Sequence, residues 1–310
     1  MCTAASFKRG GHFFGRTLDN DVSYGEEVVI SPRNFKLWRG GGEHYAVMGM
    51  ATVKEGLPLY YDGMNEKGLC MAGLNFIGFA GYSAPREGRV NLAQYELIPY
   101  ILGTCATVAE AKRVLEEVNL TDEAFSPEMP AAQLHWMISD GQCDIVAECT
   151  DGKMHIYADE AGVLTNNPPF DMQMFNLNNY MALSAGRANN NFCPSLGLSE
   201  YGFGMGAIGL PGDFSSQSRF VRAAFIRNNY VPRDGEDGRT SLFHILGGVS
   251  VPHGCCRSGE GWAHTLYTCC MDGVKGAYSY TTYGDPSPHS LTFGDCNPDG
   301  NRLLRKKIIL

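Results

Sequence analysis

The second residue of the chain, Cys2, has the type and the position that most directly suggest chemistry. If the initiator methionine is removed, Cys2 carries both a thiol and a free α-amine. An α-amine titrates at roughly pH 7.7–8.0, so it can accept the thiol proton near neutral pH without a histidine partner. Cys2 is therefore a candidate amino-terminal nucleophile, with Met1 absent from the mature protein. The alternative is that Cys2 is incidental, which its position alone would favour.

Two charged residues downstream could assist this thiol. If the segments Cys2–Lys8 and His12–Leu18 are neighbouring strands, Arg16 and Asp19 return to the level of Cys2. A guanidinium beside a thiol favours the reactive thiolate, and a carboxylate can orient the α-amine. The other interpretation is a surface ion pair worth about 0–1 kcal/mol. The sequence leaves both interpretations of this pair open.

The composition restricts the kinds of partner. The chain has 310 residues, 44% of them hydrophobic, and a net charge of −8. Nucleic acids and anionic membranes bind clustered Lys and Arg side chains, so we expect this chain to bind neither. No apolar stretch reaches transmembrane length and no basic-then-apolar leader is present, which predicts a cytoplasmic protein. We expect residues 1–310 to form one domain, because no long linker divides them.

The cysteines and histidines form no disulfide or metal pattern. Eleven cysteines are an odd number, and the chain has no secretory leader, so structural disulfides are not expected. The adjacent pairs Cys255-Cys256 and Cys269-Cys270 do not match zinc or thioredoxin spacing. The eight histidines include no His-Glu-x-x-His motif. We therefore expect no metal and no organic cofactor.

The elements that must position these residues are mainly strands. Short apolar segments between glycine-rich turns predict an amino-terminal group of strands and a central and a late group of hairpins. The Asp-Gly pairs at 140, 151 and 272 are strong hairpin signals, because a type I′ turn needs positive φ at both central residues. The predicted strands are Cys2–Lys8, His12–Leu18, Glu27–Ile30, Tyr45–Val53, Leu69–Phe76, Leu134–Ser139, Cys143–Cys149, Met154–Ala158, His264–Met271, Val274–Tyr283 and His289–Phe293.

Helical patterns separate these groups of strands. Thr107 and Glu110 form a capping-box signature that opens one helix. Further helices are predicted at Asn91–Leu102, Phe170–Leu183 and Ser216–Asn228. This order is not the βαβα alternation of a parallel sheet. It predicts an α+β fold in which two antiparallel sheets lie between helical layers.

A series of short segments carries a resemblance to a known family. They occur in the family's order over most of the chain, and together they are much more specific than any one of them. On these segments the chain resembles the choloylglycine hydrolase family, which comprises bile salt hydrolases and penicillin V acylases. The segments are Cys2-Thr3-Ala4, Phe14–Asp19, Ser23–Glu26, Asn65–Leu69, Ala72–Phe76, Gly162–Pro168, Leu210–Asp213 and Ser218–Arg222.

The resemblance implies roles for particular residues. Cys2 would be the nucleophile and its α-amine the base, while Arg16 and Asp19 match the family's thiol-activating arginine and positioning carboxylate. Asn75 and Asn166 match the positions associated with the oxyanion hole. Both asparagines also suit tight turns, so a structural role remains open for Asn166.

One more catalytic residue and a set of lining residues follow from the same resemblance. Arg219 matches the remaining active-site arginine, although it could equally brace its helix. Ile77 departs from the family pattern, because many relatives have proline there. Residues in segments that line the family's substrate mouth are Leu18, Tyr24, Phe79, Phe125 and Met129; aromatic and methionine side chains are often plain core as well.

The resemblance implies the four-layer αββα fold of amino-terminal nucleophile hydrolases. It implies a cysteine amidase that cleaves glycine- or taurine-conjugated bile salts, without metal or cofactor, and a homotetramer. Penicillin V and N-acyl homoserine lactones are alternative substrates for the same chemistry; Asn75 argues against penicillin V, since Gram-positive penicillin V acylases typically carry tyrosine there. An alternative of another class is a catalytically silent relative that only binds ligands.

Overall fold

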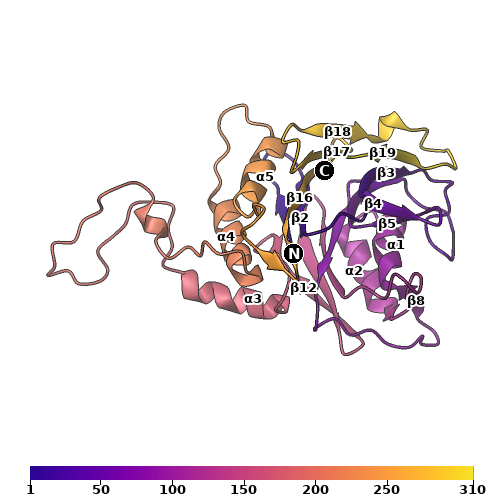
Figure 1. Cartoon of the computed structure of the whole chain (residues 1–310), viewed down its shortest axis with the longest axis horizontal. Helices are drawn as coiled ribbons and strands as arrows, with labels where there is room; N and C mark the ends of the chain where they lie inside the picture. Colours follow the sequence, from indigo (N-terminus) through magenta and orange to yellow (C-terminus); the bar gives the residue numbers. More distant parts are fainter. Residues whose placement is uncertain (310) are drawn as a thin grey trace.

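Residues 1–309 are described by a computed structural model in which two antiparallel sheets pack face to face between helices (Figure 1). The first sheet has six strands and carries the amino terminus. In spatial order its strands are β13 (Val163–Leu164), β1 (Cys2–Phe7), β2 (Phe13–Asn20), β16 (His264–Asp272), β17 (Ala277–Thr282) and β18 (His289–Thr292).

The second sheet has nine strands, of which β5 (Leu57–Tyr60) pairs only with β4. Two small sheets, one of them parallel, lie outside it: β8 (Val90–Ala93) with β9 (Val118–Thr121), and β14 (Arg257–Ser258) with β15 (Gly261–Trp262). The main strands, in spatial order, are β12 (Lys153–Ala158), β11 (Asp144–Thr150), β10 (Leu134–Ser139), β7 (Cys70–Asn75), β6 (Asp62–Asn65), β4 (Val47–Lys54), β3 (Glu27–Ser31) and β19 (Leu304–Lys307).

Helices cover the outer face of each sheet. On the six-stranded sheet, α4 (Ser216–Asn229) contacts β1 and β13, and α5 (Gly238–Gly247) contacts β1, β2 and β16. On the nine-stranded sheet, α1 (Leu97–Thr104) contacts β4, β6 and β7, and α2 (Val108–Glu117) contacts β11 and β12. A further helix, α3 (Phe170–Asn176), packs Phe170 against Phe220 of α4. The predicted αββα sandwich is confirmed.

Strand β7 shows why the two sheets can stack. Its residues Cys70, Ala72 and Leu74 belong to the core shared with the six-stranded sheet, whereas Met71 belongs to the core under α1. Side chains alternate across a strand, so a strand with both faces buried reads as a continuous apolar run. This central position places the end of β7, at Asn75, close to the start of β1.

The predicted hairpins form, but their turns differ. Only the turn at Asp151-Gly152 has positive φ at both residues, 50° and 67°, as a type I′ turn requires. At the other two turns an aspartate side chain accepts backbone N–H groups instead: Asp140 from Gln142 and Cys143, and Asp272 from Val274 and Lys275. These aspartates act through their side chains rather than through a left-handed backbone.

Two helix predictions need correction. Residues Asn91–Ala93 form the end of β8, and the helix begins only at Leu97, after a 3₁₀ turn (Gln94–Glu96). The helix predicted at Phe170–Leu183 ends at Asn176 and continues as a 3₁₀ turn, Leu177–Tyr180. The helix after Thr107 is confirmed, since the Thr107 hydroxyl accepts the Glu110 N–H. Helix α5 and the short strands β5, β6, β13 and β19 were not predicted.

Candidate active site

Cys2 is the first residue of β1, which is flanked on both sides by β13 and β2. It pairs with Leu18, and two residues further on Ala4 pairs with Arg16. Paired residues and residues two apart share a face of an antiparallel sheet. The register therefore places the side chains of Cys2, Arg16 and Leu18 on one face, and this face looks toward the nine-stranded sheet.

Arg16 contacts the thiol directly. Its Nη2 lies 2.5 Å from Cys2 Sγ, and its Nη1 donates to the carbonyls of Gly73 at 2.7 Å and Tyr61 at 3.2 Å. The side chain is fully buried. Burial opposes its charge, but Cys2, Tyr267 and Asp62 together raise the pKa of Arg16 above its ordinary value. A permanently charged guanidinium at this distance favours the thiolate of Cys2.

Asp19 lies on the opposite face of β2, toward α4. Its Oδ1 accepts the hydroxyl of Thr265 at 2.6 Å, and its Oδ2 accepts the hydroxyl of Thr17 at 3.2 Å. Nη1 of Arg219 is 4.0 Å from Asp19 Oδ2. Asp19 and Arg219 are both buried completely, so each provides the counter-charge that the other needs away from water.

Arg219 of α4 holds the backbone around the nucleophile. Its Nη1 donates to the Cys2 carbonyl at 2.5 Å and to the Thr3 hydroxyl at 2.7 Å, and its Nη2 donates to Asn166 Oδ1 at 2.8 Å. Burial lowers the pKa of Arg219, against the opposing effect of Asp19. Arg219 therefore contacts both Cys2 and Asn166 directly.

Asn166 connects the nucleophile with Asn75. Its Oδ1 accepts the Cys2 backbone N–H at 2.8 Å, and its Nδ2 donates to the Asn75 carbonyl at 2.8 Å. These partners fix which atom of the amide is oxygen, because backbone N–H groups only donate and carbonyls only accept. The neighbouring Asn167 donates to Ile77 instead. Asn166 is therefore the asparagine of this pair that contacts Cys2.

Met1 is present in this structure and extends the β1–β2 pairing. Its amino group donates to the Asp19 carbonyl at 2.5 Å, and its carbonyl accepts the Asp19 N–H at 2.8 Å. The nitrogen of Cys2 is thus a peptide nitrogen here. The same atom becomes the α-amine if Met1 is removed, with the oxygen of Asn166 already beside it.

A cavity of about 500 Å³ is lined by Cys2, Arg16, Asp19 and Asn75. Four of the predicted lining residues, Leu18, Tyr24, Phe125 and Met129, are in its wall. Phe79 is not among its lining residues and stacks on Phe76 at a centroid distance of 5.4 Å. Wall residues that the sequence did not indicate include Leu59, Tyr61, Tyr95, Ile98 and Leu134.

The missed wall residues come from segments far apart in the chain. Tyr95, in the 3₁₀ turn before α1, packs edge-on against Phe125 at a centroid distance of 5.3 Å. Tyr95 and Ile98 lie in the segment Asn91–Leu102, which is apolar on several faces, and this pattern indicates more than one packing partner. The cavity lies within the 300–1,000 Å³ typical of small-molecule sites.

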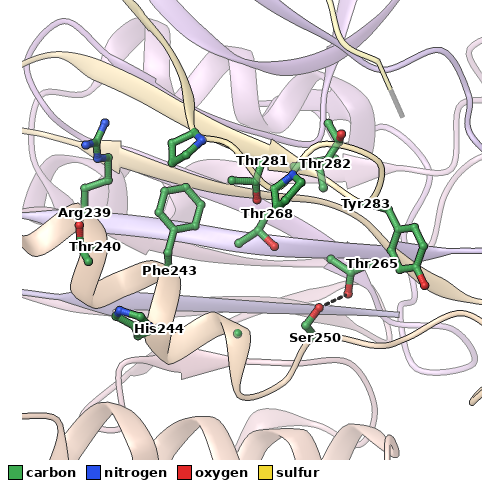
Figure 2. Close-up of a pocket in the computed structure, with 14 residues that line it drawn as sticks. Arg239, Thr240, Phe243, His244, Ser250, Thr265, Thr268, Thr281, Thr282 and Tyr283 are labelled. Carbon is green, nitrogen blue, oxygen red and sulfur yellow. Dashed lines mark hydrogen bonds between the residues drawn. The ribbon is translucent and has the colours of Figure 1, made fainter.

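A second hollow of about 410 Å³ lies on the outer face of the six-stranded sheet, beside α5. Figure 2 shows Phe243 rising from α5 toward the strands that carry Thr268 and Thr281. This second hollow is lined by hydroxyl and aromatic side chains, with His244 and Arg239 at one end, and Cys2 does not line it. Thr265 lines this hollow and bonds Asp19, so it joins the two regions.

Among residues 1–309, no group of three or more His, Cys, Asp or Glu side chains is placed to hold a metal ion. In the same part of the chain, no helix has both the length and the apolar character needed to cross a bilayer.

Comparisons with known proteins agree with this geometry. The bile salt hydrolase/transferase of Lactiplantibacillus plantarum is 44% identical, over 98% of this chain and 96% of the relative. That of Clostridium perfringens is 38% identical, over 99% and 97%. The structure of the mutant C2A conjugated bile acid hydrolase from Clostridium perfringens matches with a TM-score of 0.92 and 37% identity, over 100% of this chain and 97% of that one.

A more distant structure has the same fold. The penicillin V acylase from Agrobacterium tumefaciens matches with a TM-score of 0.76 at 22% identity, over 98% of this chain and 90% of that one. The family model for linear amide C–N hydrolases of the choloylglycine hydrolase family matches residues 2–303. With its nucleophile at the start of β1 and relatives over nearly its full length, the chain belongs to the choloylglycine hydrolase family, whose members hydrolyse linear amide bonds.

Proposed function

We propose that the chain hydrolyses the amide bond of bile salts conjugated with glycine or taurine, through a thioester on Cys2. The observation that carries this proposal is the placement of a thiol, contacted by a buried guanidinium, in the lining of a 500 Å³ cavity. Apolar side chains line the cavity, among them Leu59, Ile98, Phe125 and Leu134. Such a wall suits a steroid, and the names of relatives over 37% identical support this substrate class.

The proposed cycle begins after removal of Met1. The α-amine of Cys2 takes the thiol proton, and the oxygen of Asn166, 2.8 Å from that nitrogen, orients it. Arg16 stabilises the resulting thiolate through its Nη2. The thiolate attacks the amide carbon of the substrate, which gives a tetrahedral oxyanion. Arg219 holds the backbone carbonyl of Cys2, and Asp19 provides the counter-charge for Arg219.

The oxyanion requires donors. Both Asn75 and Asn166 match the family's oxyanion positions. In this arrangement Asn166 uses its Oδ1 for the Cys2 nitrogen and its Nδ2 for the Asn75 carbonyl. We therefore assign Asn166 first to orienting the amine and Asn75, which is exposed at the cavity, to donating to the oxyanion. The protonated α-amine gives its proton to the departing amino acid, and water then hydrolyses the thioester.

The test measures the primary amine released from glycocholate, taurocholate, penicillin V and an N-acyl homoserine lactone. Intact mass first establishes that the purified protein lacks Met1, and Cys2→Ser protein is the control. We expect release of glycine or taurine by wild-type protein and none by the control. No release from either bile salt by protein without Met1 would overturn the proposal. Release from penicillin V alone, or from an acyl homoserine lactone alone, would assign that compound as the substrate instead.

A catalytically silent binding protein is the remaining alternative. Retention of Met1 on the purified protein would favour it, because the base would then be missing. Binding of glycocholate without turnover, measured by calorimetry on the wild-type chain, would establish it. The direct contact between Arg16 and Cys2 supports the enzyme instead, because ligand binding alone does not need an activated thiol.

We also propose that the chain assembles into a homotetramer. The segment between α3 and α4 projects far from the body of the molecule (Figure 1). It exposes large apolar side chains that a single copy leaves in water, among them Phe192, Tyr201 and Phe203, with Tyr201 90% exposed. Light scattering after size exclusion tests this: wild-type protein should have the mass of four chains, and Tyr201→Ser/Phe203→Ser protein a smaller one. A monomeric wild-type protein would contradict it.

A cytoplasmic location is part of the proposal. All eleven cysteines are free in the structure, including the exposed Cys143 and Cys255. Unpaired exposed thiols suit a reducing compartment. Cell fractionation of the native host is the test, with amidase activity expected in the cytoplasmic fraction; activity mainly in the culture medium would contradict it.

A further inference from the structure

A buried carboxylate that the reaction cycle above does not use follows directly after Tyr61, whose carbonyl accepts a hydrogen bond from Arg16. Asp62, the first residue of β6, is completely buried. Both of its oxygens accept tyrosine hydroxyls from the six-stranded sheet, Oδ2 from Tyr267 at 2.6 Å and Oδ1 from Tyr278 at 2.7 Å. The two tyrosines are buried as well. The Asp62 carboxylate therefore lies between the two sheets, and two hydroxyl groups of the six-stranded sheet hold it there.

We propose that Asp62 is a positioning residue for the nucleophile, because it supplies the negative charge that balances Arg16 before the thiolate forms. This inference rests on the proposed role of Arg16 and extends it. Arg16 also donates to the Tyr61 carbonyl, the peptide unit directly before Asp62. A buried guanidinium needs a nearby anion, and the neutral thiol of Cys2 cannot be one.

Among the groups whose charges act on Arg16, Asp62 is the carboxylate. The ionisable side chains whose charges act on Arg16 are Cys2 from β1, Asp62 from β6, and Tyr267 and Cys269 from β16. Burial raises the pKa of Asp62, whereas Arg16 and the two tyrosine hydroxyls oppose that shift. Burial likewise raises the pKa of Tyr267, Tyr278 and Cys269, so these three remain neutral near neutral pH.

The charge of Asp62 determines how strongly Arg16 stabilises the Cys2 thiolate. Each oxygen of Asp62 accepts a tyrosine hydroxyl, and these two hydrogen bonds favour its ionised form. With Asp62 ionised, Arg16 stabilises the thiolate less than an isolated guanidinium would. Without Asp62, the thiolate becomes the main partner of Arg16 and is favoured at lower pH. A thiolate that is more stable is also a weaker nucleophile, so Asp62 keeps the thiolate reactive.

The experiment measures the pH dependence of iodoacetamide alkylation at Cys2, read by peptide mass spectrometry, which needs no substrate. In Asp62→Asn protein we expect the alkylation midpoint to move to lower pH by about one unit. The matched control is Asp159→Asn, which makes the same change at another buried carboxyl, and its midpoint should equal that of wild type. An unchanged or raised midpoint in Asp62→Asn protein would overturn the inference.

A double-mutant cycle tests the charge pairing through stability, and if Asp62→Asn alone does not fold, recovery of folding in Arg16→Gln/Asp62→Asn protein takes its place. If the two charges balance each other, Arg16→Gln/Asp62→Asn protein should lose less unfolding free energy than the sum of the two single variants. Strictly additive losses, or a double variant that also fails to fold, would contradict the charge pairing. Because alkylation is independent of substrate, an error in the bile salt assignment would leave this result unaffected.

Discussion

The hydroxyl of Thr265 donates to the Asp19 carboxylate across 2.6 Å, from a strand that also lines the hollow on the outer face of the sheet. The same oxygen accepts the Val251 backbone N–H at 2.8 Å. Thr265 therefore links the carboxylate beside the nucleophile to the loop before β14. Figure 2 shows its further bond with Ser250.

Replacing Thr265 with valine removes this donor while keeping the side-chain shape. We expect Thr265→Val to lower the free energy of unfolding by about 1–3 kcal/mol, since a buried carboxylate oxygen and a buried N–H lose their partner. With Asp19 less firmly held, kcat should fall about tenfold while KM changes little. Urea unfolding and steady-state kinetics measure both. Thr268→Val, which changes the same hollow without touching Asp19, should stay near wild type; equal effects of the two would contradict the role of Thr265.

Replacing Arg16 tests the activation of the thiol. Arg16→Gln should slow iodoacetamide alkylation of Cys2 near neutral pH by about tenfold, because the thiolate loses its charged partner. Arg222→Gln is the control: this buried arginine of α4 bonds to the carbonyls of Pro211, Asp213 and Gly248 and not to Cys2. If Arg16→Gln protein is labelled as fast as wild type, Arg16 serves structure or substrate binding only.

The two neighbouring asparagines offer an internally controlled comparison. Asn166→Ala should reduce kcat by about 10²-fold or more, the low end of what a positioned general base contributes, because the Cys2 nitrogen loses the oxygen that orients it. Asn167→Ala should reduce it far less, since Asn167 bonds to Ile77 and not to Cys2. Turnover of glycocholate by the two proteins, each checked by circular dichroism, gives the answer. Similar losses in both would assign this turn a merely structural role.

Substitutions at two phenylalanines distinguish a residue of the cavity wall from a residue outside it. Phe125→Ala should raise KM for a conjugated bile salt about tenfold, because burying a phenylalanine side chain contributes about 1.5–3 kcal/mol. Phe79→Ala should leave KM within about twofold, since Phe79 lies outside the wall and a small surface change contributes little. A larger increase in KM for Phe79→Ala than for Phe125→Ala would show that the substrate extends over the rim.

Stability should depend on pH through a carboxyl remote from the site. Burial, with help from the charge of Asp144, raises the pKa of Asp159 to about 8. The unfolded carboxyl titrates at about 3.9, so between these values only the folded state holds the proton. The free energy of unfolding should therefore fall as pH rises from about 4 to about 8.

Asp159→Asn should remove this part of the pH dependence. Urea unfolding at pH 5 and pH 8 measures it, and the variant should gain stability relative to wild type at the higher pH. Asp234→Asn, at an exposed position, is the matched control and should leave the profile unchanged. An Asp159→Asn protein with the wild-type pH profile would disprove the assignment.

The sequence predicted the elements with strong local signals. The β1–β2 hairpin, the Asp-Gly hairpins and the Thr107 cap were all found, since alternation, turn residues and capping act within a few residues. The residues around Cys2 were predicted because two of them, Arg16 and Asp19, lie on the strand that pairs with it. Asn75, Asn166 and Arg219 were reached only through resemblance to the family.

The remaining features depend on partners distant in sequence. Residues Asn91–Ala93 form a strand because Asn119 and its neighbours pair with them, although their apolar pattern also fits a helix. The short strand β13 contains only Val163 and Leu164, too few residues for any periodicity. The cavity wall combines Leu59, Ile98 and Leu134 from separate elements, so only the packed fold defines it. The contacts of Thr265 with Asp19 and of Asp62 with Tyr267 also join residues distant in sequence.

The nucleophile begins a strand that is hydrogen-bonded on both edges, by β13 and by β2. A catalytic residue on a loop can be displaced by local fraying, whereas Cys2 is buried, paired with Leu18, and two residues away from the Ala4–Leu164 pair on the other edge of β1. Thermal inactivation of this protein should therefore follow the cooperative melting of the whole molecule, with the enzyme fully active up to the onset of that transition.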